Sequence, residues 1–287
     1  MDGLLLMDKP AGPTSHDVVA AVRRALGERR VGHAGTLDPA ATGLLVVLAG
    51  RATRLARFVA LLDKRYRGTV RFGWETDTDD ATGEPLERDD GWRERSDAEV
   101  AGAVAAVAAG PTQVPPRVSA KKVAGERAYA LARRGADVAL APVPVAIHEI
   151  VVVAPLDRGT GELVIDVRCG AGTYVRAIAR DLGRALGSRA HLASLRRVGI
   201  GPWRVEDALP LASLEQGRPA LRPLDEAVRH LPSLDVGPAD AEAIGHGRKL
   251  GDAARLEGPV AVFGAGRLLA VAEWQEGRYA PLVVLAS

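Results

Sequence analysis

The segment that decides the fold reads Val31-Gly32-His33-Ala34-Gly35-Thr36-Leu37-Asp38-Pro39-Ala40-Ala41-Thr42-Gly43, followed directly by Leu44-Leu45-Val46-Val47-Leu48. Three glycines and a proline favour an irregular, well-held loop, and Pro39 biases Asp38 toward an extended backbone. The five apolar residues after the loop predict a buried strand. A loop anchored to a core strand is suited to holding one reactive side chain, and Asp38 is the only carboxylate in this loop.

The region around this loop is strongly basic. From Ser15 to Arg71 there are 11 Lys and Arg residues against 4 Asp and Glu residues, a net charge of +7. The whole chain hides this asymmetry, because its formal net charge is only +2. Positive surroundings favour an ionised carboxylate and attract a polyanion. The alternative is that Asp38 is an ordinary turn residue and that the arginines form a solvated face.

Length and composition limit the classes of protein to be considered. The chain has 287 residues and is 47% hydrophobic, which is enough for one large domain or for a large and a small one. Its single cysteine, Cys169, excludes a disulfide framework and a cysteine zinc site. The N-terminus lacks the features of a signal peptide, and no apolar run approaches the length of a membrane span. We therefore expect a cytoplasmic protein without a membrane partner.

Hydrophobic periodicity and stop signals predict an alternation of strands and helices. We expect strands at 3–7, 44–48, 64–73, 145–153 and 162–168, and helices at 15–26, 51–62, 97–108, 126–133, 174–186 and 225–231. Gly27 suits the end of the first helix, and Thr173 is a candidate cap for the helix at 174–186. The segment 76–83 resembles a calcium loop but lacks the final glutamate, so we interpret it as a polar turn.

Two further segments suggest contact with a nucleic acid. In Lys64-Arg65-Tyr66-Arg67 an aromatic residue lies among basic residues, a pattern suited to stacking a base beside phosphates. A strand tyrosine packed on the core is the alternative. The segment 113–134 is basic, contains Lys121 and Lys122 and follows two prolines, which suits a projecting segment that orders on a partner.

Four motifs occur in one order: Leu6-Met7-Asp8-Lys9-Pro10-Ala11-Gly12, the loop segment 32–43, Lys64-Arg65-Tyr66-Arg67 and Gly172-Thr173-Tyr174-Val175-Arg176. Together with Leu195-Arg196-Arg197 after them, this combination closely resembles the bacterial TruB-type tRNA pseudouridine synthases. The resemblance covers nearly the whole chain. It implies an α/β fold of the α+β kind, with a mixed, largely antiparallel central sheet flanked by helices.

The resemblance also implies a reaction. The substrate would be the uridine at position 55 in the T-loop of tRNA, whose N1–C1′ bond breaks and whose C5–C1′ bond forms. Substrate and product are isomers, so no cofactor, metal or energy source is needed. A base in a folded tRNA must leave its stack to be reached, so base flipping is expected. The partner would be the tRNA elbow, bound by a monomeric protein that needs neither guide RNA nor a protein subunit.

Residue roles follow from the matching motif positions. Asp38 corresponds to the catalytic aspartate of the family; attack on C1′, addition to C6 and abstraction of a sugar proton all remain open for it. Arg176 would pair with Asp38 and hold it charged. The pocket would be completed by a stacking Tyr66, a lining Tyr174 and an apolar wall at Leu195. Lys9, with Pro10, would brace the site or form a structural ion pair.

The remaining positions are expected to contact RNA. His33 would occupy the place that the flipped base leaves. The candidate phosphate contacts are Lys64, Arg65, Lys121, Lys122 and Arg197, each of which has a solvated charge as the alternative.

The domains implied by the resemblance are a catalytic domain at 1–232, with an RNA-binding insertion at about 113–140, and a small β-rich PUA-like domain at 233–287. Two rival functions stay open. One is an RNA chaperone or binding protein without the chemistry, and the other is a relative that depends on guide RNA.

Overall fold

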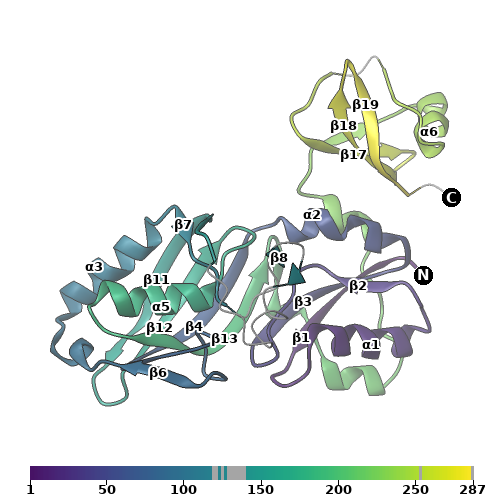
Figure 1. The fold of residues 1–287 in the computed structure, drawn as a ribbon. Helices are drawn as coiled ribbons and strands as arrows, with labels where there is room; N and C mark the ends of the chain where they lie inside the picture. The colour runs from purple at the N-terminus through teal and green to yellow at the C-terminus, as the bar shows by residue number, and fades with distance from the viewer. Residues whose placement is uncertain (118–121, 124–125, 128–139, 252–253, 286–287) are drawn as a thin grey trace.

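The computed structural model describes residues 1–287 except 118–121, 124–125, 128–139, 252–253 and 286–287 (Figure 1). Its centre is a nine-stranded sheet. In spatial order the strands are β11 (Ile147–Asp157), β12 (Glu162–Cys169), β4 (Lys64–Phe72), β13 (Ala190–Ile200), β3 (Thr42–Ala49), β1 (Gly3–Lys9) and β15 (Leu209–Pro210), while β14 (Trp203–Arg204) pairs with β13 and β2 (Val31–His33) with β3. Among these pairs β1–β15 and β13–β3 are parallel and the rest are antiparallel. The expected mixed, largely antiparallel sheet is confirmed.

The sheet consists of two halves that meet at a short parallel junction. β13 pairs with β3 only at Arg196–Thr42 and Arg197–Gly43, whereas β1 pairs with β3 along its full length. Gly43 has a φ of 102°, and a Cβ at this position would collide with the backbone of Arg197. Glycine is therefore required where the two halves touch. Figure 1 shows β11, β12, β4 and β13 on the left of this junction and β3, β1 and β2 on its right.

Strands β1 and β3 are buried on both faces. Alternate residues of β1 enter two different cores: Leu4 and Leu6 pack with α2 (Ala56–Ala60) and the segment before it, whereas Leu5 and Met7 pack with α1 (Ser15–Leu26). Because side chains alternate across a strand, a continuous apolar run is what a strand between two cores requires. This explains the run at 44–48, whose prediction as a buried strand is confirmed.

Two helices begin and end where the sequence predicted. α1 (Ser15–Leu26) starts with a capping box between Thr14 and Asp17 and ends at Gly27, whose φ is 62°. α3 (Asp97–Ala108) starts with a second capping box between Ser96 and Glu99. Local side-chain hydrogen bonds set both starts, which is why the sequence alone was sufficient to place them.

α5 (Val175–Ala185) packs against β13 and β4 and lies beside α3. The apolar residues Ile178, Leu182 and Leu186, which recur at every fourth position, are buried. The predicted cap at Thr173 is wrong, because the cap residue is Tyr174 and makes no side-chain cap hydrogen bond. Helix α5 carries Arg176 in its first turn.

Three expected helices differ from the structure. The segment 51–62 forms a 3-10 helix (Gly50–Leu55) followed by the short α2 (Ala56–Ala60), and 225–231 is represented by a 3-10 helix (Leu224–Val228). Residues 126–127 of the expected helix at 126–133 form strand β9 instead, and the rest of that prediction lies outside the described residues.

Basic residues of the segment 51–62 bind the end of the chain. Arg51 forms an ion pair with Asp2 and donates a hydrogen bond to the carbonyl of Leu285, while Arg54 donates to the carbonyl of Val284. These two arginines therefore serve tertiary structure and do not form a free basic stripe.

The remaining elements are short pairs and a separate small sheet. The pairs are β5 (Trp74–Thr76) with β6 (Pro85–Arg88), β7 (Thr112–Gln113) with β10 (Val143–Pro144), and β8 (Lys122–Val123) with β9 (Glu126–Arg127). Further 3-10 helices lie at Gly91–Glu94, Val205–Asp207 and Leu211–Glu215. The small sheet contains β16 (Ser233–Asp235), β17 (Pro259–Gly264), β18 (Arg267–Gln275) and β19 (Arg278–Val284), accompanied by α6 (Pro238–Gly245). Within the part of the chain that the structure describes, no helix is both long and apolar enough to span a membrane.

Candidate active site

The loop that carries Asp38 is held by its backbone carbonyls. The guanidinium of Arg197 donates to the carbonyls of Gly35 (3.1 Å), Thr36 (3.3 Å) and Leu44 (2.7 Å). Arg197 is 1% exposed and reaches the loop from β13, across the junction between the two halves of the sheet. Hydrogen bonds from a charged donor are stronger than neutral ones, so this side chain fixes the entry to the loop.

Two more side chains hold the centre of the loop. The Ser15 hydroxyl donates to the carbonyl of Leu37 (3.1 Å) and accepts from its N–H (2.9 Å). The ammonium group of Lys9, which is 0% exposed, donates to the carbonyls of Pro10 (2.9 Å) and Pro39 (3.0 Å). Asp38 is thus flanked on both sides by residues whose backbone is tied to α1 and β1.

Lys9 braces the loop through carbonyl groups. Burial lowers the pKa of its ammonium group, the nearby Asp38 carboxylate raises it, and Arg197 adds to the lowering. Of the two expected roles for Lys9, the described contacts match the bracing role.

Asp38 faces Arg176 across the junction. The distance from Asp38 Oδ2 to Arg176 Nη2 is 3.1 Å, and the two side chains differ sharply in exposure, 44% for Asp38 and 8% for Arg176. One half of the sheet therefore supplies the carboxylate and the other half, through α5, supplies the guanidinium.

The opposite edge of the Arg176 guanidinium is also engaged. Nη1 donates to the carbonyl of Thr78 (3.0 Å) and lies 3.5 Å from a carboxylate oxygen of Asp80. The other Asp80 oxygen accepts hydrogen bonds from the Thr78 hydroxyl and from the N–H and hydroxyl of Thr82. Arg176 consequently lies between two carboxylates, Asp80 and the more exposed Asp38.

A cavity of about 150 Å³ opens beside this pair. Its lining residues are Thr36, Leu37, Asp38, Tyr66, Thr173, Tyr174, Val175, Arg176 and Leu195. The structure thus brings together five residues that the sequence singled out: Asp38, Arg176, Tyr66, Tyr174 and Leu195. Burial raises the pKa of the Tyr66 hydroxyl, although Arg197 nearby opposes the shift, so the phenol stays protonated around neutral pH.

His33 lies near the site but does not line its cavity. It belongs to β2, where it pairs with Val47, and its ring meets the ring of His16 edge-on at a centroid distance of 5.5 Å. Burial lowers the pKa of His33, and the charges of His16 and Arg197 add to this effect. The imidazole is therefore mainly neutral at pH 7.

Two of the expected phosphate contacts, Lys64 and Arg197, have buried side chains. Arg197 is buried, and each of its three guanidinium nitrogens donates to a backbone carbonyl of the loop or of β3. Lys64 is also buried, its ammonium group donates to the carbonyls of Ala60 and Leu62, and desolvation lowers its pKa to about 8. Both side chains are used inside the protein and are not presented to a ligand.

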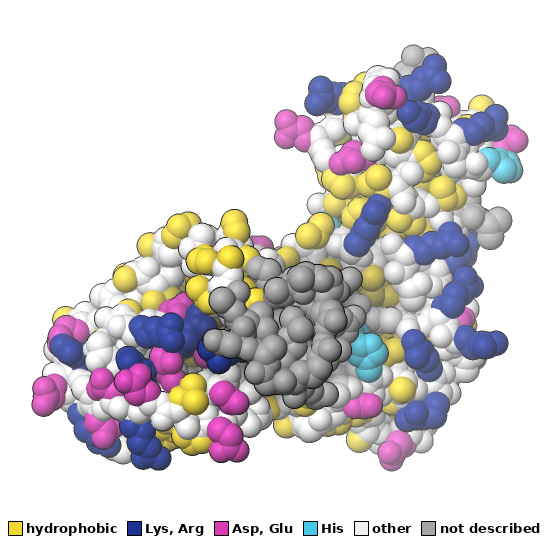
Figure 2. All heavy atoms as spheres, viewed as in Figure 1, with side chains coloured by type: hydrophobic (Ala, Val, Ile, Leu, Met, Phe, Trp, Pro, Cys, Tyr) yellow, Lys and Arg dark blue, Asp and Glu magenta, His cyan; other side chains and the backbone are white. Residues whose placement is uncertain are grey.

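The other expected contacts divide into exposed and undescribed residues. Arg65 is exposed on β4 beside Tyr66. Lys121 lies outside the described residues, and the next residue, Lys122, is the first residue of β8. Figure 2 shows further Lys and Arg side chains along the edge formed by α1 and β2.

Sequence reasoning missed Asp79, Asp80, Arg180 and Gln113. The first two belong to the segment 76–83, which we interpreted as a plain turn. A usable signal was present in α5: Arg176 and Arg180 are one turn apart on a helix whose other face is apolar, and buried arginines need acidic partners. The sequence did not show which acids those would be.

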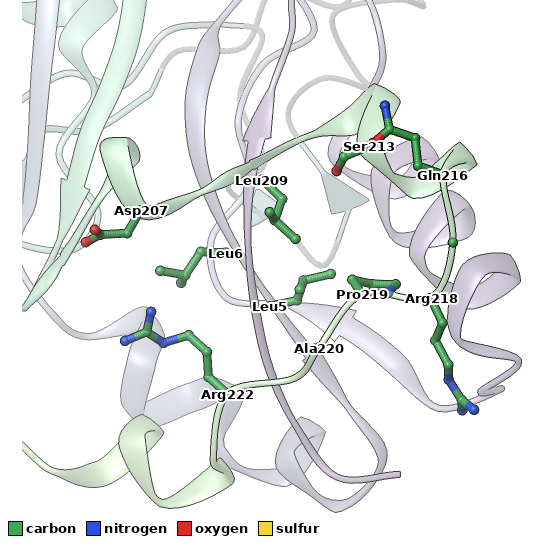
Figure 3. A pocket seen from close by; sticks show the side chains of 11 residues that line it. Leu5, Leu6, Asp207, Leu209, Ser213, Gln216, Arg218, Pro219, Ala220 and Arg222 are labelled. Atoms are coloured by element: carbon green, nitrogen blue, oxygen red, sulfur yellow. The ribbon is translucent and has the colours of Figure 1, made fainter.

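A second, larger cavity lies away from all the predicted residues. Its volume is about 450 Å³, and Figure 3 shows Leu5, Leu6 and Leu209 on its walls, with polar side chains such as Arg222 at its border. Size alone therefore does not identify the site. Among the described residues, no group of His, Cys, Asp and Glu is arranged to hold a metal ion.

Chemically, the smaller cavity offers an accessible carboxylate fixed by a buried guanidinium, with two tyrosines and a leucine as walls. Such a site can stack a flat ring and present an oxygen nucleophile or base to it.

Comparison with protein families gives three consecutive matches. Residues 23–175 match the TruB family pseudouridylate synthase N-terminal domain, 176–229 the tRNA pseudouridylate synthase B C-terminal domain, and 231–286 the tRNA pseudouridine synthase II C-terminal model.

Similar curated proteins are named tRNA pseudouridine synthase B. The one from Thermobifida fusca is 46% identical over 292 residues, covering 99% of each chain. The one from Mycobacteroides abscessus is 44% identical over 289 residues, covering 99% of this chain and 96% of the relative.

Solved structures show the same fold at lower identity. A chain of a Cbf5–Nop10–Gar1 complex superposes with a TM-score of 0.74 at 24% identity, covering 99% of this chain and 84% of that one. A chain of an H/ACA RNP bound to a substrate RNA containing 2′-deoxyuridine gives 0.73 at 22% identity, with 99% and 85% coverage.

Proposed function

This chain belongs to the TruB family of pseudouridylate synthases, and from this premise we propose that it isomerises uridine 55 in the T-loop of tRNA to pseudouridine. The observation that carries the proposal is the 3.1 Å pair between Asp38 and Arg176 at the edge of a cavity walled by Tyr66, Tyr174 and Leu195. The reaction breaks N1–C1′, turns the freed uracil and joins C5 to C1′. The proton lost from C5 is balanced by the one gained at N1, so no co-reactant is consumed.

Asp38 is the catalytic residue in this proposal. Its carboxylate is accessible while the groups that hold it are buried, so it can approach a ligand without moving the loop. Attack on C1′, addition to C6 and removal of a sugar proton would each use an oxygen of the Asp38 carboxylate. Arg176 contacts Asp80 through Nη1 and Asp38 through Nη2, so its planar guanidinium can orient the Asp38 carboxylate.

The size of the cavity supports an everted base as its ligand. At about 150 Å³ it is smaller than the ~300–1,000 Å³ typical of pockets for whole small molecules. A single ring stacked on Tyr66 suits this volume better than a complete nucleotide. The base must then leave the tRNA stack before the reaction.

The rest of the tRNA would bind outside the cavity. We assign the T-arm to the exposed basic residues near β4, among them Arg65, and to the insertion at about 113–140. We divide the chain into a catalytic part at 1–232 and a small RNA-binding part at 233–287. The protein acts in the cytoplasm, where its tRNA substrate is found, and needs neither guide RNA nor a protein subunit.

The test is tritium release from a T-arm stem-loop labelled at C5 of the target uridine. The purified wild-type chain should release tritium without any added RNA or protein. Failure to release it despite tight binding of the stem-loop would favour the RNA-binding rival, and release only after addition of a guide RNA would favour the guide-dependent one.

Binding of the stem-loop should weaken steeply with salt, because bound Lys and Arg release counterions from the RNA. An affinity that does not change with salt would contradict the RNA interface.

A further inference from the structure

The side chain of Gln113 is buried next to the proposed active site but does not line its cavity. Gln113 is 3% exposed and lies in β7, where it pairs with Val143 of β10. Its Oε1 accepts a hydrogen bond of 3.0 Å from the backbone N–H of Tyr174. Since an N–H must be met by an acceptor, this contact fixes which end of the amide faces Tyr174.

This hydrogen bond satisfies the start of α5. Tyr174 is the N-cap residue of the helix, and its side chain accepts no hydrogen bond from the first helical turn. The first N–H groups of a helix have no partner within the helix and need one from elsewhere. Gln113 supplies such a partner from a strand that is about 60 residues earlier in the sequence.

Val114, the residue after Gln113, binds α5 at Arg180, about one and a half turns after Tyr174. The carbonyl of Val114 accepts a hydrogen bond of 2.8 Å from Arg180 Nη2, while Arg180 Nη1 donates to Asp79 at 2.8 Å. Gln113 and Val114 therefore bracket Arg176 along the helix. The two prolines that follow, Pro115 and Pro116, are buried and stiffen the segment.

We propose that Gln113 is a positioning residue for the isomerase reaction: its carboxamide oxygen fixes Tyr174 and the first turn of α5, so that the cavity wall and Arg176 keep their places relative to Asp38. This inference rests on the proposed function. Gln113 acts through Tyr174 and has no contact with the base.

The other end of the amide supports a role beyond packing. Gln113 Nε2 is buried and, among the described residues, has no hydrogen-bond partner. A buried donor without a partner costs stability, so a residue selected only for stability at this place would be apolar. The glutamine is explained by the acceptor that it offers to Tyr174.

The experiment compares three variants with the wild type on a C5-tritiated stem-loop under single-turnover conditions. Gln113→Leu keeps the volume and removes the acceptor. Gln113→Glu keeps an acceptor at the same reach and removes the Nε2 donor, and its charge is favourable at a helix N-terminus. Thr112→Val changes the exposed neighbour in β7 and is the matched control.

We expect the single-turnover rate of Gln113→Leu to fall about 10-fold, the size of one lost hydrogen bond, with stem-loop affinity and melting temperature close to wild type. Gln113→Glu should recover most of the rate, and Thr112→Val should not differ from wild type. A Gln113→Leu variant with an unchanged rate, or one whose loss is entirely in affinity or melting temperature, overturns the inference. An inactive wild-type protein would instead refute the proposed function, and this inference with it.

Discussion

Two of the three arginines of helix α5, Arg176 and Arg180, lie one turn apart and meet their acids in different surroundings. Arg180 pairs with Asp79 at 2.8 Å, and both side chains are nearly sealed, at 7% and 11% exposed. Arg176 pairs with Asp38 at 3.1 Å, but here the carboxylate is 44% exposed. The arginines are equally buried, so the difference lies wholly in the acids.

The comparison shows how one structural device can serve two purposes. A sealed pair on both sides is fixed and unreactive, and removing one partner leaves a buried charge. A pair that is buried on the arginine side and open on the acid side presents a fixed carboxylate to a ligand, as a preorganised site requires. The predictions below test this contrast.

The largest effect is expected for Asp38→Asn. The amide keeps the size of the side chain but is a poor nucleophile and base, so tritium release should fall at least about 10³-fold. Stem-loop binding should change little, because the tRNA is held mainly by other residues. A variant that binds and reacts normally would remove Asp38 from the catalytic role.

A smaller loss of activity is expected for Arg176→Lys. Lysine keeps the charge but cannot serve Asp38, Thr78 and Asp80 at once with a planar fork, and we expect turnover to fall about 10²-fold. The measurement is the single-turnover rate at saturating enzyme. Full activity would mean that positive charge alone suffices and that the planar geometry is unimportant.

The sealed pair should respond in stability. Asp79→Asn removes the buried counter-ion of Arg180 and leaves the more exposed Asp181 as its partner, so the free energy of unfolding should fall by about 3 kcal/mol. Urea denaturation measures this loss, while the single-turnover rate of the folded fraction should change by less than about 10-fold. Loss of activity without loss of stability would break the distinction between the two pairs.

The smallest effect, a change in the pH dependence of stability, is expected for His33, which lies in β2 just before the Asp38 loop. Its pKa is lowered by burial, so the unfolded chain binds a proton more readily than the native one. The free energy of unfolding should therefore fall as the pH drops below about 6.5, by less than ~1.4 kcal/mol per pH unit for a single histidine. His33→Gln should remove this contribution in urea titrations at pH 7.5 and 5.5, and an unchanged slope would show that His33 is not desolvated.

Local signals predicted much of the fold and part of the site. The capping residues Thr14 and Ser96 define helix starts through contacts three residues away, so α1 and α3 could be placed from sequence. Motif resemblance singled out Asp38 and Arg176, and the structure brings them together.

The errors occurred where distant residues decide the outcome. Arg197 resembles a surface cation in sequence, yet it is buried because its donors find loop carbonyls some 160 residues earlier. The turn around Asp80 looks self-sufficient, since its threonines satisfy one carboxylate oxygen, and the sequence gives no sign that the other faces Arg176. Tertiary partners of this kind are not encoded in spacing or composition.

The parallel contact between β13 and β3 has a mechanical consequence. In the backbone pairing of the sheet, two residue pairs join the half that is connected to the Asp38 loop to the half that contains Tyr66 and packs against α5. A rotation of one half of the sheet relative to the other at this contact would change the distance between Asp38 and Arg176, because the two residues lie on opposite sides of it. Arg197, which belongs to β13, donates to the carbonyls of Thr36 and Gly35 and so ties the Asp38 loop to the other half of the sheet.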